Sequence, residues 1–432
     1  MTATQPTPAA ADRPVSVPEQ LLRALGSMRL AVVLLVVLGL LTWLGTLAQV
    51  GRSLFDVQRE YFESWFVWAK LPIAIHRWVP FDRPLVIPLP GAYPVMALLF
   101  LNLLVGGFLR MRWNLRFAGI LITHVGIALL LVAGFVKMHY SYSGNLALFE
   151  AAADGRPMGD RVTQASTFVS YNDYELALLR DGEPIEERVV PEAALLGARG
   201  TGVVTLRADG LPFRIEVRHW FDNCDVMRKG PMFTPPVPVV GGLFLAGLDP
   251  TDKRERDVAG CYVRVIPDQG EPIDGIITGE ESRPLTAHRF PFTFTVQGQR
   301  YGLDLRRVIY DLPFAVRLDE FRKNDHPGTD MARDFRSFVT VFEGSSQRQA
   351  QIFMNTPLRK DGFVLYQASF GQAGMGGSDG AAVPYTVLEV ANNPSDKWPE
   401  YACWVIFAGM LLHFVTKLAR FLDSSTRKAL QA

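Results

Sequence analysis

The sequence predicts a membrane protein with four transmembrane α-helices, three N-terminal and one C-terminal, and a large all-β extracytoplasmic domain. Two observations support this fold class. Four apolar runs are long enough to cross a bilayer as helices. Between the third and fourth runs, roughly 260 residues contain short alternating segments that are rich in β-branched and aromatic residues and end at Gly, Pro or Asp. We expect this domain to be sandwich-like.

The composition fits one membrane unit joined to soluble structure. The chain has 432 residues, of which 49% are hydrophobic, and its net charge is only +1. Without a basic excess, nucleic acid is not an expected partner. The three cysteines form no CxxC pair and no zinc-like cluster, which disfavours thiol-redox and structural-metal roles. Cys224 and Cys261 could form one disulfide in an oxidising compartment or stay free, and the sequence is compatible with both.

The N-terminal part contains a tail, the first span and a loop. Residues 1–29 are expected to be a disordered cytoplasmic tail, because their first part is rich in Pro, Ala and Thr. Residues 30–48 form the first predicted span, since this run is too long for a signal-peptide core. Residues 49–91 are expected to be an extracytoplasmic loop whose aromatic rings prefer the headgroup layer. The tryptophans of this loop are Trp65, Trp68 and Trp78.

The second span and the short loop after it set the predicted topology. Residues 92–109 form the second span, in which Asn102 is expected to make an interhelical hydrogen bond. The loop 110–116 contains three arginines, and short basic loops lie on the cytoplasmic side. We therefore expect both termini to be cytoplasmic and the domain at 138–400 to lie outside the membrane.

The third span, residues 117–137, contains a titratable residue near its start, His124. An ionisable group within a span is costly, so it is a functional candidate as well as a candidate for a plain interhelical hydrogen bond. Small residues share one sector of roughly 100° on this helix and predict close helix packing. His124 lies about 80 to 180° away from that sector, which suggests that it faces a partner subunit. The small residues are Gly119, Thr123, Gly126, Ala133 and Gly134.

The extracytoplasmic domain and the C-terminal part complete the prediction. Residues 211–221 and 312–321, LPFRIEVRHWF and LPFAVRLDEF, are similar enough to suggest an internal duplication. Residues 401–418 form the fourth span, and 419–432 form a cytoplasmic tail.

Three histidines are placed where they could act on a membrane-embedded ligand. A neutral imidazole ligates iron, and two from facing helices can hold haem. His124 is expected about 12 Å into the bilayer from the cytoplasmic side, and His413 about 6 Å from the same side. His413 is close enough to the interface to snorkel instead of pairing. His139, about 22 Å further along the third helix, could be a second relay point or an interfacial residue.

Several segments together resemble the ResB, or CcsB, family of system II cytochrome c biogenesis proteins. Three spans before the domain and one after it also fit this family. The resemblance covers most of the chain, and its most specific stretch is LPFAVRLDEFRKN. The similar segments are residues 27–49, 100–110, 122–136, 143–150, 312–324, 337–342 and 355–370.

The resemblance implies a multi-pass protein of the bacterial inner membrane with a periplasmic domain. It also implies a role in handling and exporting haem b with a CcsA/ResC-type partner, which attaches haem to apocytochrome c, and a thiol-reducing thioredoxin-like protein as a further partner. In that family a third-helix histidine binds haem, and the matching residue here is His124 in THVG. His413 is a weaker candidate that rests on its position alone. The chain lacks the partner's Trp-rich haem-presenting segment, so we expect no ligation by this chain itself and hence no enzyme.

Two other hypotheses remain. The protein could be a structural or sensory membrane protein whose β-domain binds an extracytoplasmic ligand, with His124 as a packing residue. An independent membrane enzyme is the weakest hypothesis, because the sequence contains no nucleophile motif, metal cluster or nucleotide-binding loop.

Overall fold

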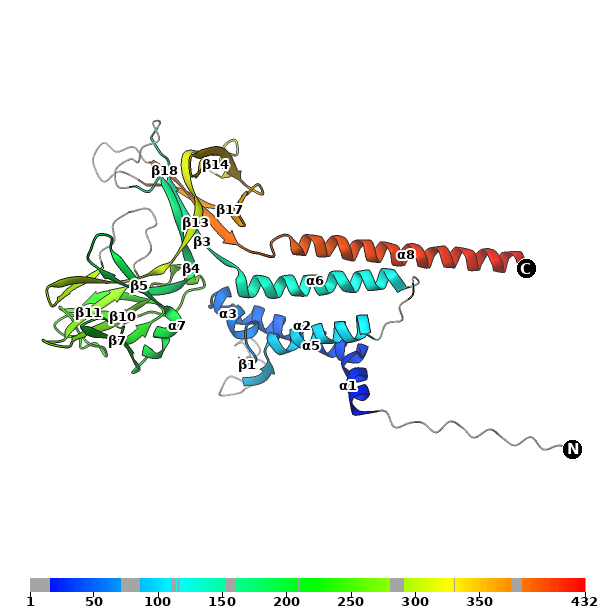
Figure 1. Cartoon of the computed structure of the whole chain (residues 1–432), viewed down its shortest axis with the longest axis horizontal. Coiled ribbons are helices and arrows are strands. Elements are labelled where there is room, and N and C mark those ends of the chain that lie inside the picture. The colour runs from blue at the N-terminus through cyan, green and yellow to red at the C-terminus, as the bar shows by residue number, and fades with distance from the viewer. Residues whose placement is uncertain are drawn as a thin grey trace. The chain divides into compact units, whose positions relative to one another are not determined.

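The computed structural model divides into two units, which are described separately (Figure 1). The first, the membrane unit, comprises Met1–Val50, Asp56–His139 and Ser395–Ala432, and the second, the β unit, comprises Gly51–Phe55 and Tyr140–Pro394. Some predicted features lie outside the described residues: the first fifteen residues, Trp78 of the predicted first loop and most of the basic loop 110–116. The structure describes residues 16–70, 86–109, 114, 117–152, 161–208, 210–279, 291–329, 331–373 and 383–431.

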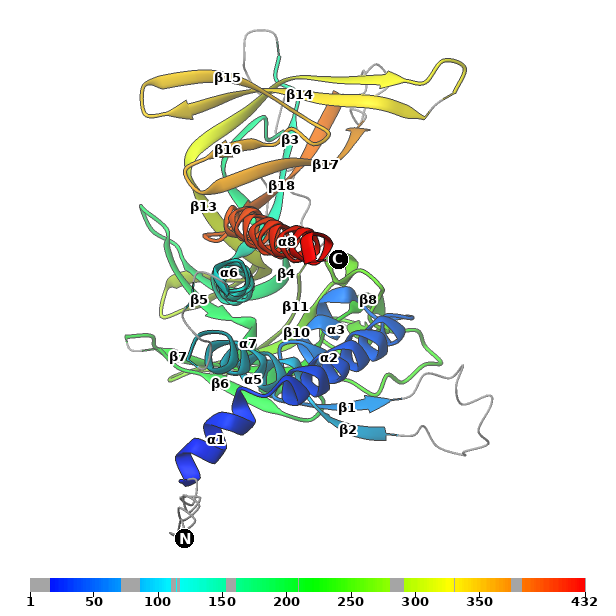
Figure 2. The same ribbon diagram turned by 90° about the vertical axis from the view of Figure 1, so that its right-hand side faces the viewer.

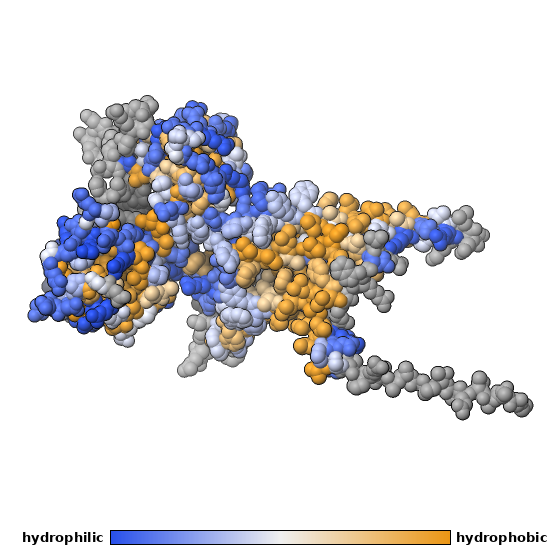
Figure 3. All heavy atoms as spheres, in the orientation of Figure 1, coloured by the Kyte–Doolittle hydropathy of each residue, from blue (hydrophilic) through white to orange (hydrophobic). Residues whose placement is uncertain are grey.

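In the part of the chain that the structure describes, four long apolar helices form most of the membrane unit and confirm the predicted number and order of spans. Figure 3 shows the apolar residues gathered over these helices. The second span ends in a π-helical segment, η1. The last helix continues through the predicted C-terminal tail, where Asp423 and Arg427 pair one turn apart at 3.2 Å. The elements are α2 (Met28–Ala48), α5 (Ala92–Leu104) with η1 (Val105–Leu109), α6 (Ala118–Tyr140) and α8 (Trp398–Gln431).

Helices α6 and α8 lie side by side through glycines (Figures 1 and 2). A Cβ atom at Gly119 would lie 2.6 Å from the backbone nitrogen of His413, and one at Gly409 would lie 2.6 Å from that of Thr123. Gly126 packs equally closely on Ile406. The predicted small-residue face is thus confirmed as a helix–helix contact, except that Gly134 has open space around its Cβ position.

The N-terminal region contains a helix where the composition predicted a disordered tail. Helix α1 (Val17–Leu25) has Pro18 in its first turn, where a missing N–H costs nothing, and ends at Gly26. Ser27 then caps α2, its hydroxyl accepting from the backbone N–H of Leu30 at 3.2 Å. Residues 17–25 therefore correct the predicted tail at 1–29. The apolar residues of this segment recur at helical spacing, and this spacing, more than the Pro- and Ala-rich composition before it, determines the local structure.

Asn102 holds the joint between α1 and α2. Its side-chain amide, which is buried, donates to the carbonyls of Leu25 at 2.5 Å and Ser27 at 3.0 Å. The predicted interhelical hydrogen bond of Asn102 is confirmed. One partner is the Leu25 carbonyl at the end of α1, where a helix leaves its last carbonyls without intrahelical partners. The other, the Ser27 carbonyl, also accepts from the backbone N–H of Ala31 in the first turn of α2 at 3.3 Å. The loop after α2 folds into α3 (Leu54–Tyr61) and a hairpin of β1 (Phe66–Lys70) and β2 (Val86–Pro90).

The β unit contains two hydrophobic cores that share two long strands, β4 (Gln164–Arg180) and β13 (Gln299–Asp325). In the first core, the four-stranded sheet β11-β10-β7-β6 packs against β12 and against the halves of β4 and β13 that lie beside it. In the second, every strand along the path β15-β14-β13-β4-β3-β18-β17-β16 of the ten-stranded sheet supplies core residues. This sheet therefore curves around its own core. The first core is therefore sandwich-like, and the predicted β-rich domain is confirmed.

The strands and short helices follow in chain order. They are β3 (Tyr142–Phe149), β4 (Gln164–Arg180), β5 (Glu186–Pro191), α7 (Glu192–Leu195), η3 (Leu196–Ala198), β6 (Val203–Leu206), β7 (Phe213–Phe221), β8 (Cys224–Arg228), β9 (Leu243–Gly247), η4 (Arg254–Arg256), β10 (Gly260–Pro267), β11 (Ile273–Thr278), β12 (Phe292–Val296), β13 (Gln299–Asp325), β14 (Ala332–Glu343), β15 (Ser346–Phe353), β16 (Leu358–Lys360), β17 (Phe363–Ala373) and β18 (Val383–Asn392).

The two similar segments occupy matching positions in different cores. In β7, Phe213, Ile215 and Val217 are buried in the first core. In β13, residues 314, 316 and 318, which are Phe, Val and Leu, are buried in the second core with the same alternation. Their likeness therefore corresponds to the same inward-facing pattern on two strands, and the duplication itself stays a prediction.

Helix packing through Gly409 gives a first test. We expect Gly409→Leu to destabilise the membrane unit by about 1–3 kcal/mol, because its side chain would enter the backbone of α6. Gly39→Leu is the matched control, since a Cβ there has no neighbour within 4 Å. Thermal unfolding in detergent measures both variants. Equal unfolding midpoints for the two would contradict close packing of α6 on α8.

The oxidation state of the cysteines gives a second test. Cys224 and Cys261 are both free and buried, and burial raises the pKa of Cys224 to about 12. The reactive thiolate is therefore rare near neutral pH, and we expect both residues to resist iodoacetamide in the folded protein. After denaturation without reductant, mass spectrometry should find all three cysteines of the chain modified. Modification of Cys403 alone would reveal a disulfide.

Candidate functional site

His124 presents one ring nitrogen that is free of the helix hydrogen bond. Its Nδ1 lies 2.7 Å from the carbonyl oxygen of Ile120, one turn earlier on α6. Because a carbonyl only accepts, Nδ1 donates to it, and an imidazole with its one proton on Nδ1 has its lone pair on Nε2. The side chain is half-buried. This arrangement fixes the tautomer that a metal ligand needs.

The ring of His124 packs against the π-helical segment η1. A Cβ atom at Gly107 would lie 2.7 Å from Cδ2 of His124, so only glycine leaves room for the imidazole in this position. The ring of His124 contacts the second span, so it does not turn away from this chain's own helices as expected, and its facing a partner subunit stays a prediction. The small-residue face of α6 meets α8, and the histidine face meets η1.

The segment η1 also contacts the joint between α1 and α2. The Cβ position of Gly106, next to Gly107, lies 3.1 Å from the carbonyl oxygen of Gly26. Short π-helical segments inside α-helices occur frequently at functional sites. The backbone at Gly106 and Gly107 is thus in contact with the joint between α1 and α2 through Gly106 and with the ring of His124 through Gly107. Sequence reasoning missed this contact, although the paired glycines after Asn102 were its signal.

Two further histidines among the described residues of the membrane unit, His413 and His139, have different neighbours. His413 is half-buried, its backbone packs on Gly119, and its ring lies 5.9 Å from that of Phe414. Among the contacts of the described residues, none joins its ring to that of His124. His139 is exposed, with its ring stacked on Phe135 at 4.3 Å and its Nδ1 3.1 Å from the Phe135 carbonyl. A haem site built from His124 and His413 alone remains a prediction.

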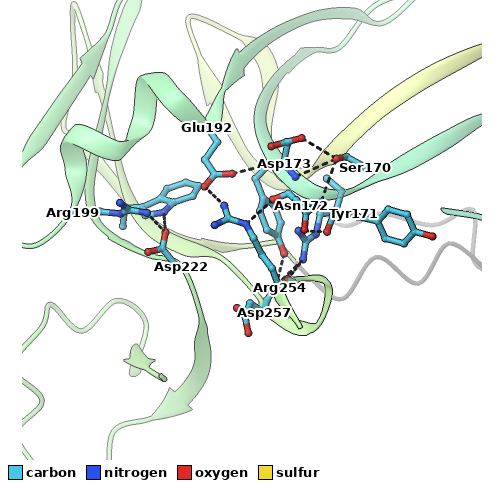
Figure 4. Close-up of polar contacts among 12 residues, drawn as sticks. Ser170, Tyr171, Asn172, Asp173, Glu192, Arg199, Asp222, Arg254 and Asp257 are labelled. Atoms are coloured by element: carbon cyan, nitrogen blue, oxygen red, sulfur yellow. Dashed lines mark hydrogen bonds and ion pairs between the residues drawn. The ribbon is translucent and has the colours of Figure 1, made fainter. Parts of the chain in front are cut away.

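A cluster of polar contacts lies in the β unit where β4 bulges away from β13 (Figure 4). Arg307 is 5% exposed and donates from Nη1 to the carbonyl of Tyr171 at 2.8 Å. Its Nη2 donates to the carbonyls of Arg254 and Asp257 at 3.0 and 2.9 Å. The guanidinium also stacks on the ring of Tyr174 at 4.1 Å. Burial lowers the pKa of Arg307 from its ordinary value.

Arg254 ties the neighbouring loop to the same bulge. Its Nε donates to the carbonyl of Asn172 at 3.1 Å, and its Nη2 pairs with Glu192 at 2.7 Å. The other carboxylate oxygen of Glu192 accepts from the backbone N–H of Tyr174 at 3.1 Å. The donors and acceptors of this cluster satisfy one another, so it stabilises the junction of the two cores. Among the described residues, no group of three His, Cys, Asp or Glu side chains could hold a metal ion.

Comparison with known proteins finds a family match over part of this β unit. Residues 292–382 match the ResB-like family. This match confirms the resemblance seen in the sequence, over a range that includes β12 through β17 and the segments at 312–324, 337–342 and 355–370. The chain has no match among the curated proteins. At the family level, the match indicates a membrane component of cytochrome c biogenesis.

The contact of Gly107 with His124 gives a third test. We expect Gly107→Ala to displace the imidazole, because the added methyl carbon would lie 2.7 Å from Cδ2, closer than van der Waals contact allows. Histidine ¹⁵N spectra of the protein in nanodiscs measure this, with the His124 signals identified by their loss in His124→Gln. Gly134→Ala is the matched control, since its Cβ position is open. Unchanged His124 signals in Gly107→Ala would contradict the contact.

Proposed function

We propose that this protein is the membrane component of system II c-type cytochrome biogenesis that handles haem with a CcsA/ResC-type partner. In this proposal the partner attaches the exported haem covalently to apocytochrome c outside the membrane. The observation that carries it is an imidazole with an open Nε2 inside the membrane unit of a chain whose β unit matches the ResB-like family. The protein would act in the bacterial inner membrane, with both termini cytoplasmic.

The residues around His124 fit an axial ligand of haem b. Haem supplies an iron that takes imidazole nitrogen as an axial ligand and a porphyrin that is attached to the apocytochrome. The Ile120 carbonyl accepts from Nδ1, which orients the ring and raises the basicity of Nε2. Gly107 packs closely against the Cδ2 edge of the ring. His124 is only half-buried, so part of the imidazole stays accessible. A second axial ligand would come from His413 or from the partner subunit.

The β unit would hold apocytochrome c or brace the partner, and it would meet a thiol-reducing thioredoxin-like protein that keeps the apocytochrome cysteines reduced. Its two cores share strands, so a ligand-binding surface on either core rests on a rigid scaffold. We place haem attachment in the partner, which makes this chain an accessory subunit and not an enzyme. Nucleic acid has no part in this proposal.

The role of His124 gives a fourth test. We expect His124→Ala, purified with the partner, to lose more than half of its Soret absorbance per complex, because the iron loses an axial ligand. His139→Ala is the control, since His139 lies exposed on the same helix. Absorption spectra and a haem stain of c-type cytochromes in the cells measure both effects. Full haem content and normal cytochrome maturation in His124→Ala would reject the ligand role. Normal c-type cytochromes after deletion of the gene would reject the proposed function.

A further inference from the structure

Helix α1 separates its apolar and polar residues onto two sides. At 100° per residue, its apolar residues span an arc of roughly 160°, and its three polar residues lie within the opposite arc. On the polar side, Glu19 and Arg23 form an ion pair at 2.7 Å, and both side chains are about half exposed. The apolar side comprises Val17, Pro18, Leu21, Leu22, Ala24 and Leu25.

The apolar side of α1 is largely uncovered in this chain. Val17 is 78% exposed, Leu21 is 60% exposed and Leu22 is 44% exposed. Within the membrane unit, Figure 2 shows α1 running away from α2 and α5, and Figure 3 shows both apolar and polar residues at its surface. Exposing this apolar face to water would be unfavourable, so we expect another apolar surface to cover it.

The joint with α2 indicates what that surface is. Only Gly26 and Ser27 separate the end of α1 from the start of the span α2. The C-terminal end of α1 therefore lies at the same level as the N-terminal end of that span. Asn102, on the neighbouring span, binds the carbonyls of Leu25 and Ser27 and fixes this short joint. An amphipathic helix held at a membrane surface buries its apolar face at the boundary between headgroups and acyl chains.

We propose that α1 lies along the surface of the lipid bilayer, with Leu21 and Leu22 in the lipid and Glu19 and Arg23 in water. The ion pair makes α1 neutral, so its attachment depends on apolar burial and not on anionic lipid. Asn102 then acts as a positioning residue that sets the angle between the surface helix and the first span. This inference stands on the membrane unit alone and does not depend on a role in haem handling.

Spin labels on the two sides of α1 test the proposal in the full-length protein. The labels are attached at Leu21→Cys and, as the matched control on the opposite side, at Glu19→Cys, in a background with Cys403→Ser. Cys224 and Cys261 are buried, so they do not compete for the label. The protein is placed in nanodiscs of phosphatidylcholine alone, and collisions with oxygen and with a water-soluble nickel chelate are measured.

We expect oxygen to dominate at position 21 by several-fold, because oxygen concentrates in the acyl region, and the nickel chelate to dominate at position 19. Nickel dominance at both positions would overturn the proposal, since α1 would then be in water. Protection of position 21 from both reagents would also overturn it and would show a covering protein, either a partner or a second copy. Both labels replace exposed side chains, so a folding defect is not expected to obscure the result.

Discussion

The close approach of α6 and α8 is the contact on which the rest of the structure depends. These two helices flank the β unit in the chain, and the glycines between them allow backbone to meet backbone. Ser395, just before α8, reinforces the pair by donating from its hydroxyl to the carbonyl of Ala133 at 2.9 Å. Without hydrophobic driving force between helices in lipid, such close packing and hydrogen bonding hold them together. The ends of the β unit are joined in a similar way, because its first strand, β3, pairs along its whole length with its last strand, β18.

That contact also decides where His124 faces. With the small-residue side of α6 committed to α8, the histidine must face elsewhere, and η1 fills that space with a glycine. The sequence correctly indicated the packing side and the unusual histidine, because both depend on helical periodicity within one segment. It did not indicate the neighbour of the histidine, because Gly107 lies inside a π-helical segment, whose wider turn places residues differently around the helix axis. Periodicity read at 3.6 residues per turn misses that difference.

Other differences between sequence and structure have similar physical causes. Helix α1 was missed because Pro and Ala in the preceding residues resemble a disordered tail, whereas its own nine residues are strongly amphipathic. Arg307 was missed because its three acceptors are backbone carbonyls of two distant segments, and carbonyls leave no mark in a sequence. The alternating strands were predictable, since burial follows a period of two. The division of those strands between two cores was not, because β4 and β13 carry both patterns in one continuous run.

Those two continuous strands make the β unit one cooperative body. Each core takes half of β4 and half of β13, so the loss of either core would leave the other with unpaired strand backbone and an exposed apolar edge. β4 and β13 are described without a break, and the buried guanidinium of Arg307 lies where these strands pass from one core to the other. We therefore expect the two cores to unfold together, because neither can come apart without disrupting strands that the other core also uses.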